Sequence, residues 1–275
     1  MLGKKKEIQA REAYFKEVAR ALLLREGYQG VTINRVAEET GFSKGTVYQR
    51  FGSKEELITA IGIDCRTELL ATIQKAASYT GCPRERMVAL GETLACYAKY
   101  QKDNQRILKI IDSEAVLEKV PESQQEKMKE YDLQVFLTVL GIIQDAIAAG
   151  ELVLRNGSTP QGLCFAFWAM IDGSFDASMG GAPLREVGIE DPTAEVVRNC
   201  HYMMDGYGWR PLSSECDYDA VARRIRATLL EETPSDANLA AAEGRNRPDF
   251  IRNALDGGGK TVLSGQALSL VKGGA

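Results

Sequence analysis

Residues 27–57 read GYQGVTINRVAEETGFSKGTVYQRFGSKEEL, and their pattern predicts two short helices joined by a turn and followed by a third helix. Thr32 is a suitable N-cap, and the apolar residues after it repeat at helical spacing until Gly41. Ser43 and Ser53 are in position to cap the second and third helices. The stretch therefore predicts a helix-turn-helix with a supporting helix behind it.

The second short helix has one apolar residue that we expect to face inward, Val47. The residues left to face outward are Lys44, Thr46, Tyr48, Gln49 and Arg50. An ordinary helical hairpin with a solvated charged face is the alternative interpretation. Lys54 lies in the first turn of the third helix, where a cation costs a few tenths to about 1 kcal/mol because of the helix dipole. We therefore expect an external anion, such as a DNA phosphate, to offset that cost.

Together with the helix before it, this segment resembles the DNA-binding domain of the TetR family of transcriptional regulators. The residues that carry the resemblance are Phe15, Val18, Ala19, Leu22, Leu23, Gly27, Tyr28, Thr32, Ile33, Val36, Ala37, Gly41, Ser43, Gly45, Thr46, Val47, Tyr48, Phe51, Lys54, Glu55 and Leu57. Gln49 and Arg50 depart from the family, which often has Tyr or Arg followed by His there. This departure bears on the DNA sequence that is read, not on the fold.

The resemblance implies a role in DNA binding for nine residues of this chain. The residues expected to approach bases are Lys44, Gly45, Gln49 and Asn34. The residues expected to contact mainly phosphates are Thr32, Thr46, Tyr48, Arg50 and Lys54.

The charge of the chain is unevenly distributed. The 275 residues include 34 Lys and Arg against 38 Asp and Glu, which disfavours nucleic-acid binding by the chain as a whole. Residues 1–62, however, hold 11 basic and 8 acidic residues, and the remainder holds 23 and 30. The positive charge therefore accompanies the predicted helix-turn-helix.

Several functional classes are disfavoured by the sequence. The charged residues after Lys6 argue against a signal peptide, and no run of about 20 apolar residues suggests a membrane span. The six cysteines have no CxxC spacing and the chain has one histidine, which disfavours a zinc site and a Ser/His/Asp triad. We expect no cofactor, no metal, no enzymatic activity and a bacterial-type cytoplasmic location with reduced thiols. A redox switch built on two cysteines remains an alternative.

The rest of the chain predicts an all-α fold: a three-helix DNA-binding domain over 1–52 and a larger helical effector-binding and dimerisation domain over 53–232. A basic arm through residue 6 and a helix over 7–26 precede the helix-turn-helix. The other predicted helices are 53–80, which connects the two domains, and then 84–102, 104–118, 123–149, 159–179, 192–207 and 217–232.

The helices over 159–179 and 192–207 are apolar around most of their circumference and need more cover than one small domain offers. The resemblance implies that these two penultimate helices form a four-helix bundle with a second copy of the chain. The predicted interface residues are Phe167, Met170, Ile171, Phe175, Val196, Cys200, Met203, Met204 and Tyr207. Some of them are equally compatible with a place in the core of the chain itself.

TetR-like proteins usually hold a small molecule in the second domain, and aromatic and sulfur-bearing residues recur there at helical spacing. The predicted lining residues are Cys96, Tyr97, Tyr100, Met128, Tyr131, Phe136, Phe165 and Trp168. They suggest a small hydrophobic or aromatic effector, although plain core packing explains the same pattern.

After residue 232 the sequence becomes small, polar and glycine-rich, and we predict a flexible or docked extension over 233–275. The segment from Ala254 to Thr261, ALDGGGKT, is a loosened form of a phosphate-binding loop. No parallel-sheet pattern precedes it, so a glycine-rich linker is the better interpretation than a nucleotide site.

These observations predict a homodimeric transcriptional regulator of the TetR type. Its partners would be a palindromic double-stranded DNA operator, a second copy of the chain and a small hydrophobic ligand that releases a repressor from DNA. The alternative functions are a helical protein-binding module without DNA specificity and a nucleotide-binding protein that uses Ala254 to Thr261.

Overall fold

The computed structural model describes residues 2–155 and 157–230, in which every regular element is a helix, so the predicted all-α fold is confirmed. These residues form two compact units that divide between Leu57 and Ile58. The first unit therefore includes the first turn of the helix that we predicted to connect the domains. The predicted extension over 233–275, with its Ala254–Thr261 motif, lies outside the described residues.

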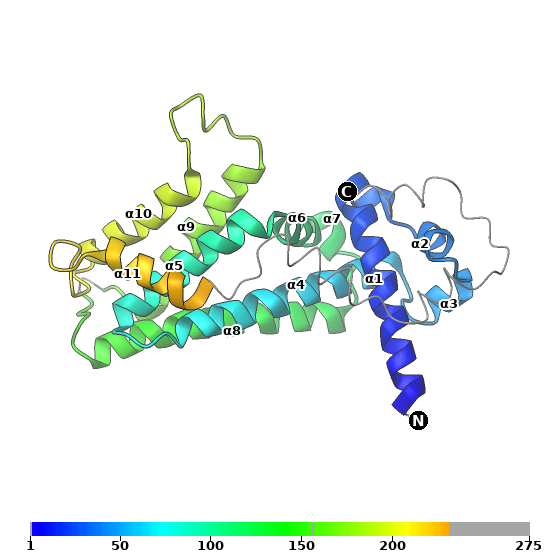
Figure 1. Ribbon diagram of the computed structural model, residues 1–275, viewed down its shortest axis with the longest axis horizontal. Helices are drawn as coiled ribbons and strands as arrows, with labels where there is room; N and C mark the ends of the chain where they lie inside the picture. The colour runs from blue at the N-terminus through cyan, green and yellow to red at the C-terminus, as the bar shows by residue number, and fades with distance from the viewer. Residues whose placement is uncertain (1, 156, 231–275) are drawn as a thin grey trace. The chain divides into compact units, whose positions relative to one another are not determined.

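The first unit contains α1 (Leu2–Gly30), α2 (Ile33–Thr40), α3 (Lys44–Tyr48) and the first turn of α4 (Lys54–Ala77). Figure 1 shows α2 beside α1 and α3 next to α2. The side chains that hold this unit together are apolar and nearly inaccessible to solvent: Phe15, Ala19, Leu22, Leu23, Val31, Ile33, Val36, Ala37, Val47, Phe51 and Leu57. Short helices such as α2 and α3 depend on this shared core, because they are marginal in isolation.

The N-terminal end of α1 differs from what we expected, whereas the break near its C-terminal end agrees with the prediction. The helix begins at Leu2, so the basic residues 4–6, which we predicted to form an arm, belong to its first turns. At the other end Gly27 adopts φ +71°, a left-handed conformation that favours glycine, and interrupts the regular helix where we expected it to stop.

The second unit contains the rest of α4 and seven further helices with a closing π-turn. They are α5 (Pro83–Tyr100), α6 (Lys102–Ile111), α7 (Glu114–Leu117), α8 (Glu122–Ala148), α9 (Pro160–Met179), α10 (Pro192–Gly206), α11 (Tyr218–Ile225) and η1 (Arg226–Leu230). The predicted helix over 104–118 is two helices, α6 and α7, because Ser113 adopts an extended backbone between them. No glycine or proline marks that break in the sequence.

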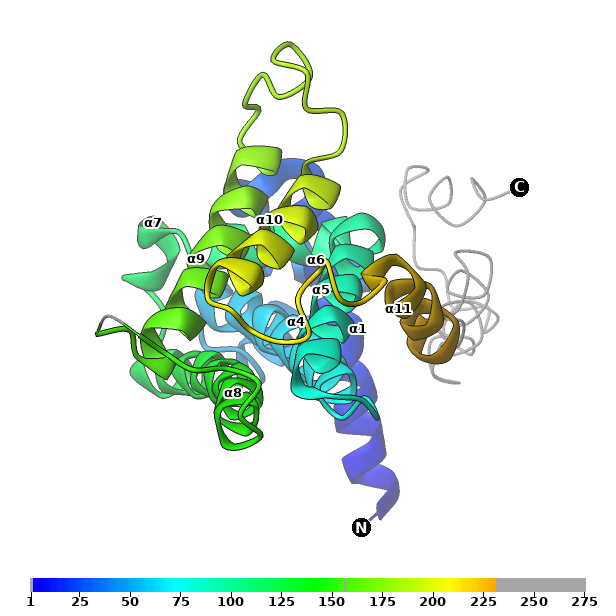
Figure 2. The ribbon, with the colours of Figure 1, turned by 90° about the vertical axis from the view of Figure 1, so that its left-hand side faces the viewer.

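α5 is the central helix of the second unit and packs against α8, α10 and α11, while α9 packs against both α8 and α10 (Figure 2). The core between these helices includes Met87, Leu90, Ile142, Ile143, Leu163, Phe167, Met204, Trp209, Val221 and Ile225. This arrangement places one face of α9 and one face of α10 in the core and leaves the opposite faces exposed.

Two arginines tie helices of the second unit together. Arg84 of α5 is fully buried; it donates to the Asp205 carboxylate at 2.5 Å and to the main-chain carbonyl of Trp209, and its guanidinium lies 4.7 Å from the Tyr218 ring centroid. Arg66 of α4 donates to Asp112 at 2.6 Å. Charged hydrogen bonds of this kind fix helix positions that apolar packing leaves adjustable.

Among the described helices, α8 has the length and the apolar composition of a membrane span, which we had not expected from the sequence. Its residues Ile142, Ile143 and Ala146 are fully buried within the second unit. Burial within the second unit covers 22% of its most apolar 18-residue stretch.

Candidate nucleic-acid interface

The turn between α2 and α3 is set by local hydrogen bonds. The Thr32 hydroxyl accepts from the Arg35 N–H at 3.2 Å and begins α2, and Gly41 ends that helix with φ +73°. The Ser43 hydroxyl then accepts from the Thr46 N–H at 3.1 Å and begins α3. Each bond satisfies an N–H group that a helix start leaves unpaired, so the predicted caps are present.

The face of α3 that points away from the core carries polar and aromatic side chains. Val47 is fully buried beneath the helix, whereas Tyr48 is 52% exposed. The predicted base-approaching residues Lys44, Gly45, Gln49 and Asn34 are all exposed, and so is Arg50. Thr32 and Thr46 are half-buried, with their hydroxyls used in the two caps. Six of the nine predicted residues therefore lie in the short segment 44–50, and five of these, 44, 45 and 48–50, are exposed.

Lys54 has partners within the first unit. Its ammonium lies 3.8 Å from the centroid of the Tyr28 ring and 3.5 Å from the Tyr28 carbonyl oxygen. The Tyr28 hydroxyl donates to Glu55 at 2.5 Å, and burial, followed by this bond, raises the pKa of Tyr28 to about 12. These three residues, the Tyr28–Lys54–Glu55 cluster, join the end of α1 to the start of α4.

The Tyr28–Lys54–Glu55 cluster removes the need for an external anion beside Lys54. The ring face and the carbonyl at the end of α1 both carry partial negative charge, and both lie within contact distance of the ammonium. An internal partner therefore offsets the cost of a cation in the first turn of α4. The phosphate contact of Lys54 stays a prediction. The contacts with Tyr28 explain a lysine at this position without an external anion.

A second set of contacts connects α1 with the end of the helix-turn-helix. Arg50 forms an ion pair with Glu12 of α1, in which one guanidinium N–H group donates to the carboxylate. One residue earlier, Arg11 lies 5.8 Å from the centroid of the Phe42 ring, which packs edge-on against Phe15 at 5.3 Å. We had not predicted a role for Glu12, because 38 residues separate it from Arg50 and no sequence spacing links the two.

The residues predicted to line an effector pocket are dispersed in the structure. Tyr100, Phe165 and Trp168 are each more than half exposed, whereas Tyr97 and Met128 are buried. The predicted set also includes Cys96, which is half-buried, Tyr131, whose hydroxyl accepts from Thr67 at 2.6 Å, and Phe136, which packs against the core.

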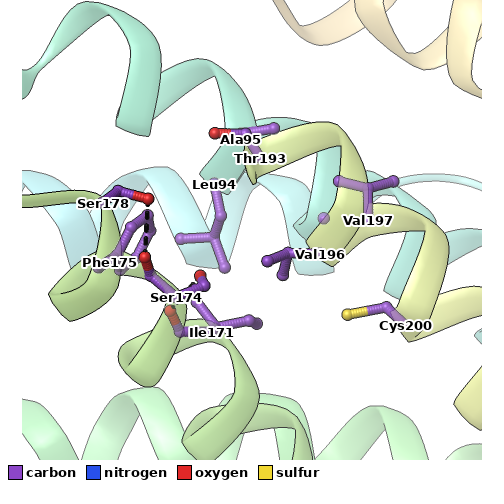
Figure 3. A pocket seen from close by; sticks show the side chains of 11 residues that line it. Leu94, Ala95, Ile171, Ser174, Phe175, Ser178, Thr193, Val196, Val197 and Cys200 are labelled. Carbon is purple, nitrogen blue, oxygen red and sulfur yellow. Dashed lines mark hydrogen bonds between the residues drawn. The ribbon is translucent and has the colours of Figure 1, made fainter. Parts of the chain in front are cut away.

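A small apolar hollow lies between α5, α9 and α10 (Figure 3). Its walls include Leu94, Ile171, Phe175, Val196 and Cys200, and none of the eight predicted pocket residues lines it. Its volume is about 40 Å³. Ligand pockets usually measure about 300–1,000 Å³, so the hollow as it stands admits no more than a few water-sized groups.

The predicted dimer-interface residues have different environments. Phe167 and Met204 are buried in the core of the second unit, and Met170, Cys200, Met203 and Tyr207 pack partly against that core. Ile171, Phe175 and Val196 line the hollow. The large apolar side chains that α9 and α10 expose to solvent are Phe165, Trp168, Met179 and Tyr202.

In the described part of the chain, no group of three or more His, Cys, Asp or Glu side chains is arranged to hold a metal ion. The six cysteines are thiols that form no disulfide bond with one another. Burial raises the pKa of Cys164 to about 11 and that of Cys200 to about 12, so both are protonated near neutral pH.

Residues 17–61 match the family model described as bacterial regulatory proteins, tetR family. The chain therefore contains a TetR-type DNA-binding segment. It is 34% identical over 59 residues to the HTH-type transcriptional repressor AcnR of Corynebacterium efficiens, and 38% identical over 72 residues to the HTH-type transcriptional regulator YfiR of Bacillus subtilis. These alignments cover 22% and 25% of this chain and 31% and 34% of the two relatives, so the chain matches about a third of their length.

The similarity to solved structures extends beyond this segment and covers 70% of the chain. PfmR of Thermus thermophilus, a TetR-family transcriptional regulator, superposes with a TM-score of 0.54 at 18% identity. The superposition covers 97% of PfmR and 70% of this chain. The comparison establishes the shared fold.

Proposed function

We propose that this chain is a sequence-specific DNA-binding transcriptional regulator that acts as a homodimer in the cytoplasm. The observation that carries the proposal is the exposed polar and aromatic face of α3 over a fully buried Val47, within the segment that matches the TetR family. A helix of this kind reads base edges when it enters the major groove of DNA.

The proposal includes repression at a palindromic operator. A protein with two-fold symmetry presents two copies of α3 and reads two related half-sites. The repressor name of the similar AcnR supports repression as the sense of regulation. Binding of both half-sites by one dimer raises the affinity well above that of a single domain, so loss of the correct spacing between the domains releases the DNA.

The proposed trigger is a small hydrophobic or aromatic ligand in the second unit. α4 is one uninterrupted helix whose first turn belongs to the first unit and whose remainder belongs to the second. A ligand that shifts α4 changes the spacing of the two DNA-binding domains. Since the hollow between α5, α9 and α10 measures about 40 Å³, such a ligand has to bind a more open conformation of these helices.

Fluorescence anisotropy tests this proposal with labelled DNA taken from beside the gene that encodes the chain. We expect tight binding that falls steeply with salt concentration and exceeds binding to scrambled DNA. Weak and sequence-independent binding, at every salt concentration and to duplexes selected from a random library, would contradict it. Equal operator affinity with and without every ligand found bound to the protein would contradict release by a ligand.

A further inference from the structure

Arg50 lies two residues after the end of α3, at the edge of the face that we propose to contact DNA, and its side chain is 46% exposed. Its ion-pair partner Glu12 is 21% exposed and comes from α1, a helix that forms no part of the reading segment. A carboxylate so close to DNA repels phosphates. The Glu12 carboxylate therefore works against DNA binding unless its contact with Arg50 offsets the repulsion.

The geometry of the Arg50 guanidinium allows it to bind Glu12 and a phosphate at the same time. An arginine has five N–H donors in a rigid planar fork, and the ion pair with Glu12 uses a donor on Nη2. Donors remain on Nε and Nη1 for a second acceptor. A phosphate can therefore bind Arg50 while Glu12 still holds it, and the arginine loses less side-chain freedom on binding because the ion pair has already restricted it.

The position of Glu12 is itself fixed by packing. Its neighbour Arg11 lies against the Phe42 ring, and Phe42 packs edge-on against the fully buried Phe15, one turn further along α1. Residues 11 and 15 of α1 therefore contact Phe42 in the turn before α3, and residue 12 contacts Arg50 beyond its end. These contacts fix the position of Glu12, and the ion pair in turn fixes the position of the Arg50 guanidinium.

We propose that Glu12 is a positioning residue for DNA binding, whose carboxylate pre-orients Arg50 toward a backbone phosphate of the operator. This inference rests on the proposed function and adds to it a residue outside the helix-turn-helix. If charge alone mattered, removal of a negative charge from the DNA-binding unit would strengthen DNA binding. The inference predicts the opposite for Glu12: loss of its charge weakens DNA binding.

A double-mutant cycle with Glu12→Gln and Arg50→Gln tests the inference. The probe is a labelled duplex selected by the wild-type protein from a random library, with sonicated genomic DNA as the non-specific comparison. In the wild-type background, Glu12→Gln weakens operator binding about three- to tenfold, because Arg50 must then be immobilised on binding. In the Arg50→Gln background, the same change strengthens binding slightly, because only the repulsion from phosphates is removed.

Glu17→Gln is the matched control, since Glu17 is an exposed carboxylate on the same helix. We expect it to strengthen binding slightly in both backgrounds. Thermal unfolding of all variants separates a structural role from a positioning role: a purely structural pair couples in the melting temperature and leaves the operator affinity of the folded protein additive.

Each outcome of the cycle is decisive. If Glu12→Gln strengthens binding equally in both backgrounds, Glu12 only repels DNA and the inference is wrong. If coupling appears in the melting temperature and not in operator affinity, the pair is structural and the inference is again wrong. If the wild-type protein selects no duplex and binds genomic DNA without salt dependence, the proposed function fails and takes this inference with it.

Discussion

Lys54 contributes to the stability of the first unit through its contacts with Tyr28. Its ammonium is held by the ring and the carbonyl of Tyr28, so we expect it to stabilise the junction between α1 and α4. Lys54→Met should cost about 1 kcal/mol of unfolding free energy, and Tyr28→Leu should remove the same interaction. Urea unfolding of the single and double variants measures the coupling. If the two effects are simply additive, the ammonium and the ring do not interact.

Gln49 is the residue at which we expect a change of DNA preference. It is exposed next to α3, at a position where the resemblance to the TetR family departs from what that family often has. Gln49→Ala should lower discrimination at one position of each half-site by about 1–3 kcal/mol and leave the salt dependence unchanged. Binding to duplexes with single base changes measures this. Arg50→Gln is the comparison, because loss of a phosphate contact should reduce the salt slope by about one and leave the preference alone.

His201 links stability to pH. Burial, together with the Arg84 cation and against the carboxylates of Asp205 and Asp219, lowers the pKa of His201 below its ordinary value of 6.5. The unfolded chain therefore binds more protons than the folded chain, so this contribution to stability is complete above pH 6.5 and is lost as the pH falls.

The corresponding experiment compares the wild type with His201→Gln in thermal melts between pH 7.5 and pH 5. We expect the wild type to lose more of its melting temperature on acidification than the variant. The chain has one histidine, so the difference between the two curves isolates this residue. Parallel curves would show that His201 titrates alike in the folded and unfolded states.

Among the elements, α5, α10 and α11 depend on one buried cation. Arg84 is inaccessible to solvent, and Asp205 is the carboxylate that neutralises it. Asp205→Asn should lower the unfolding free energy of the second unit by about 3 kcal/mol, because it leaves a buried charge without a counterion. Asp219→Asn, at an exposed position of α11, should change it by less than about 0.5 kcal/mol. Comparable losses in the two variants would contradict this account of Arg84.

The elements also show which features the sequence could predict. The caps at Thr32 and Ser43 and the stop at Gly41 are short-range signals, and they sufficed for the helix-turn-helix. Arg84 and Asp205 are 121 residues apart, so their pairing depends on the packing of α5 against α10 and has no local signature. α9 is apolar around most of its circumference, and its composition could not reveal that Phe167 faces the core while Phe165 faces solvent.

For the whole molecule, the exposed aromatic residues of α9 indicate where we expect a second copy of the chain to bind. Phe165 and Trp168 lie 5.8 Å apart between ring centroids, and each is more than half exposed. We expect a second copy of the chain to cover them. Trp168→Glu should weaken the dimer by about 2 kcal/mol, or about thirtyfold, and should weaken operator binding with it.

Sedimentation across a concentration series measures that effect. Val153→Glu is the control, because Val153 is also exposed and lies outside α9 and α10. It should leave the dimer intact. A dimer that survives Trp168→Glu unchanged would place the interface elsewhere on the second unit.

The contrast between the two tryptophans of the chain gives this protein a built-in optical probe. Trp209 is fully shielded from solvent, whereas Trp168 is 55% exposed on α9. Excitation at the red edge of the absorption band, combined with iodide quenching, therefore reports on Trp168 while Trp209 supplies a constant, blue-shifted background. If dimers form through α9, the quenchable fraction falls on concentration without any label.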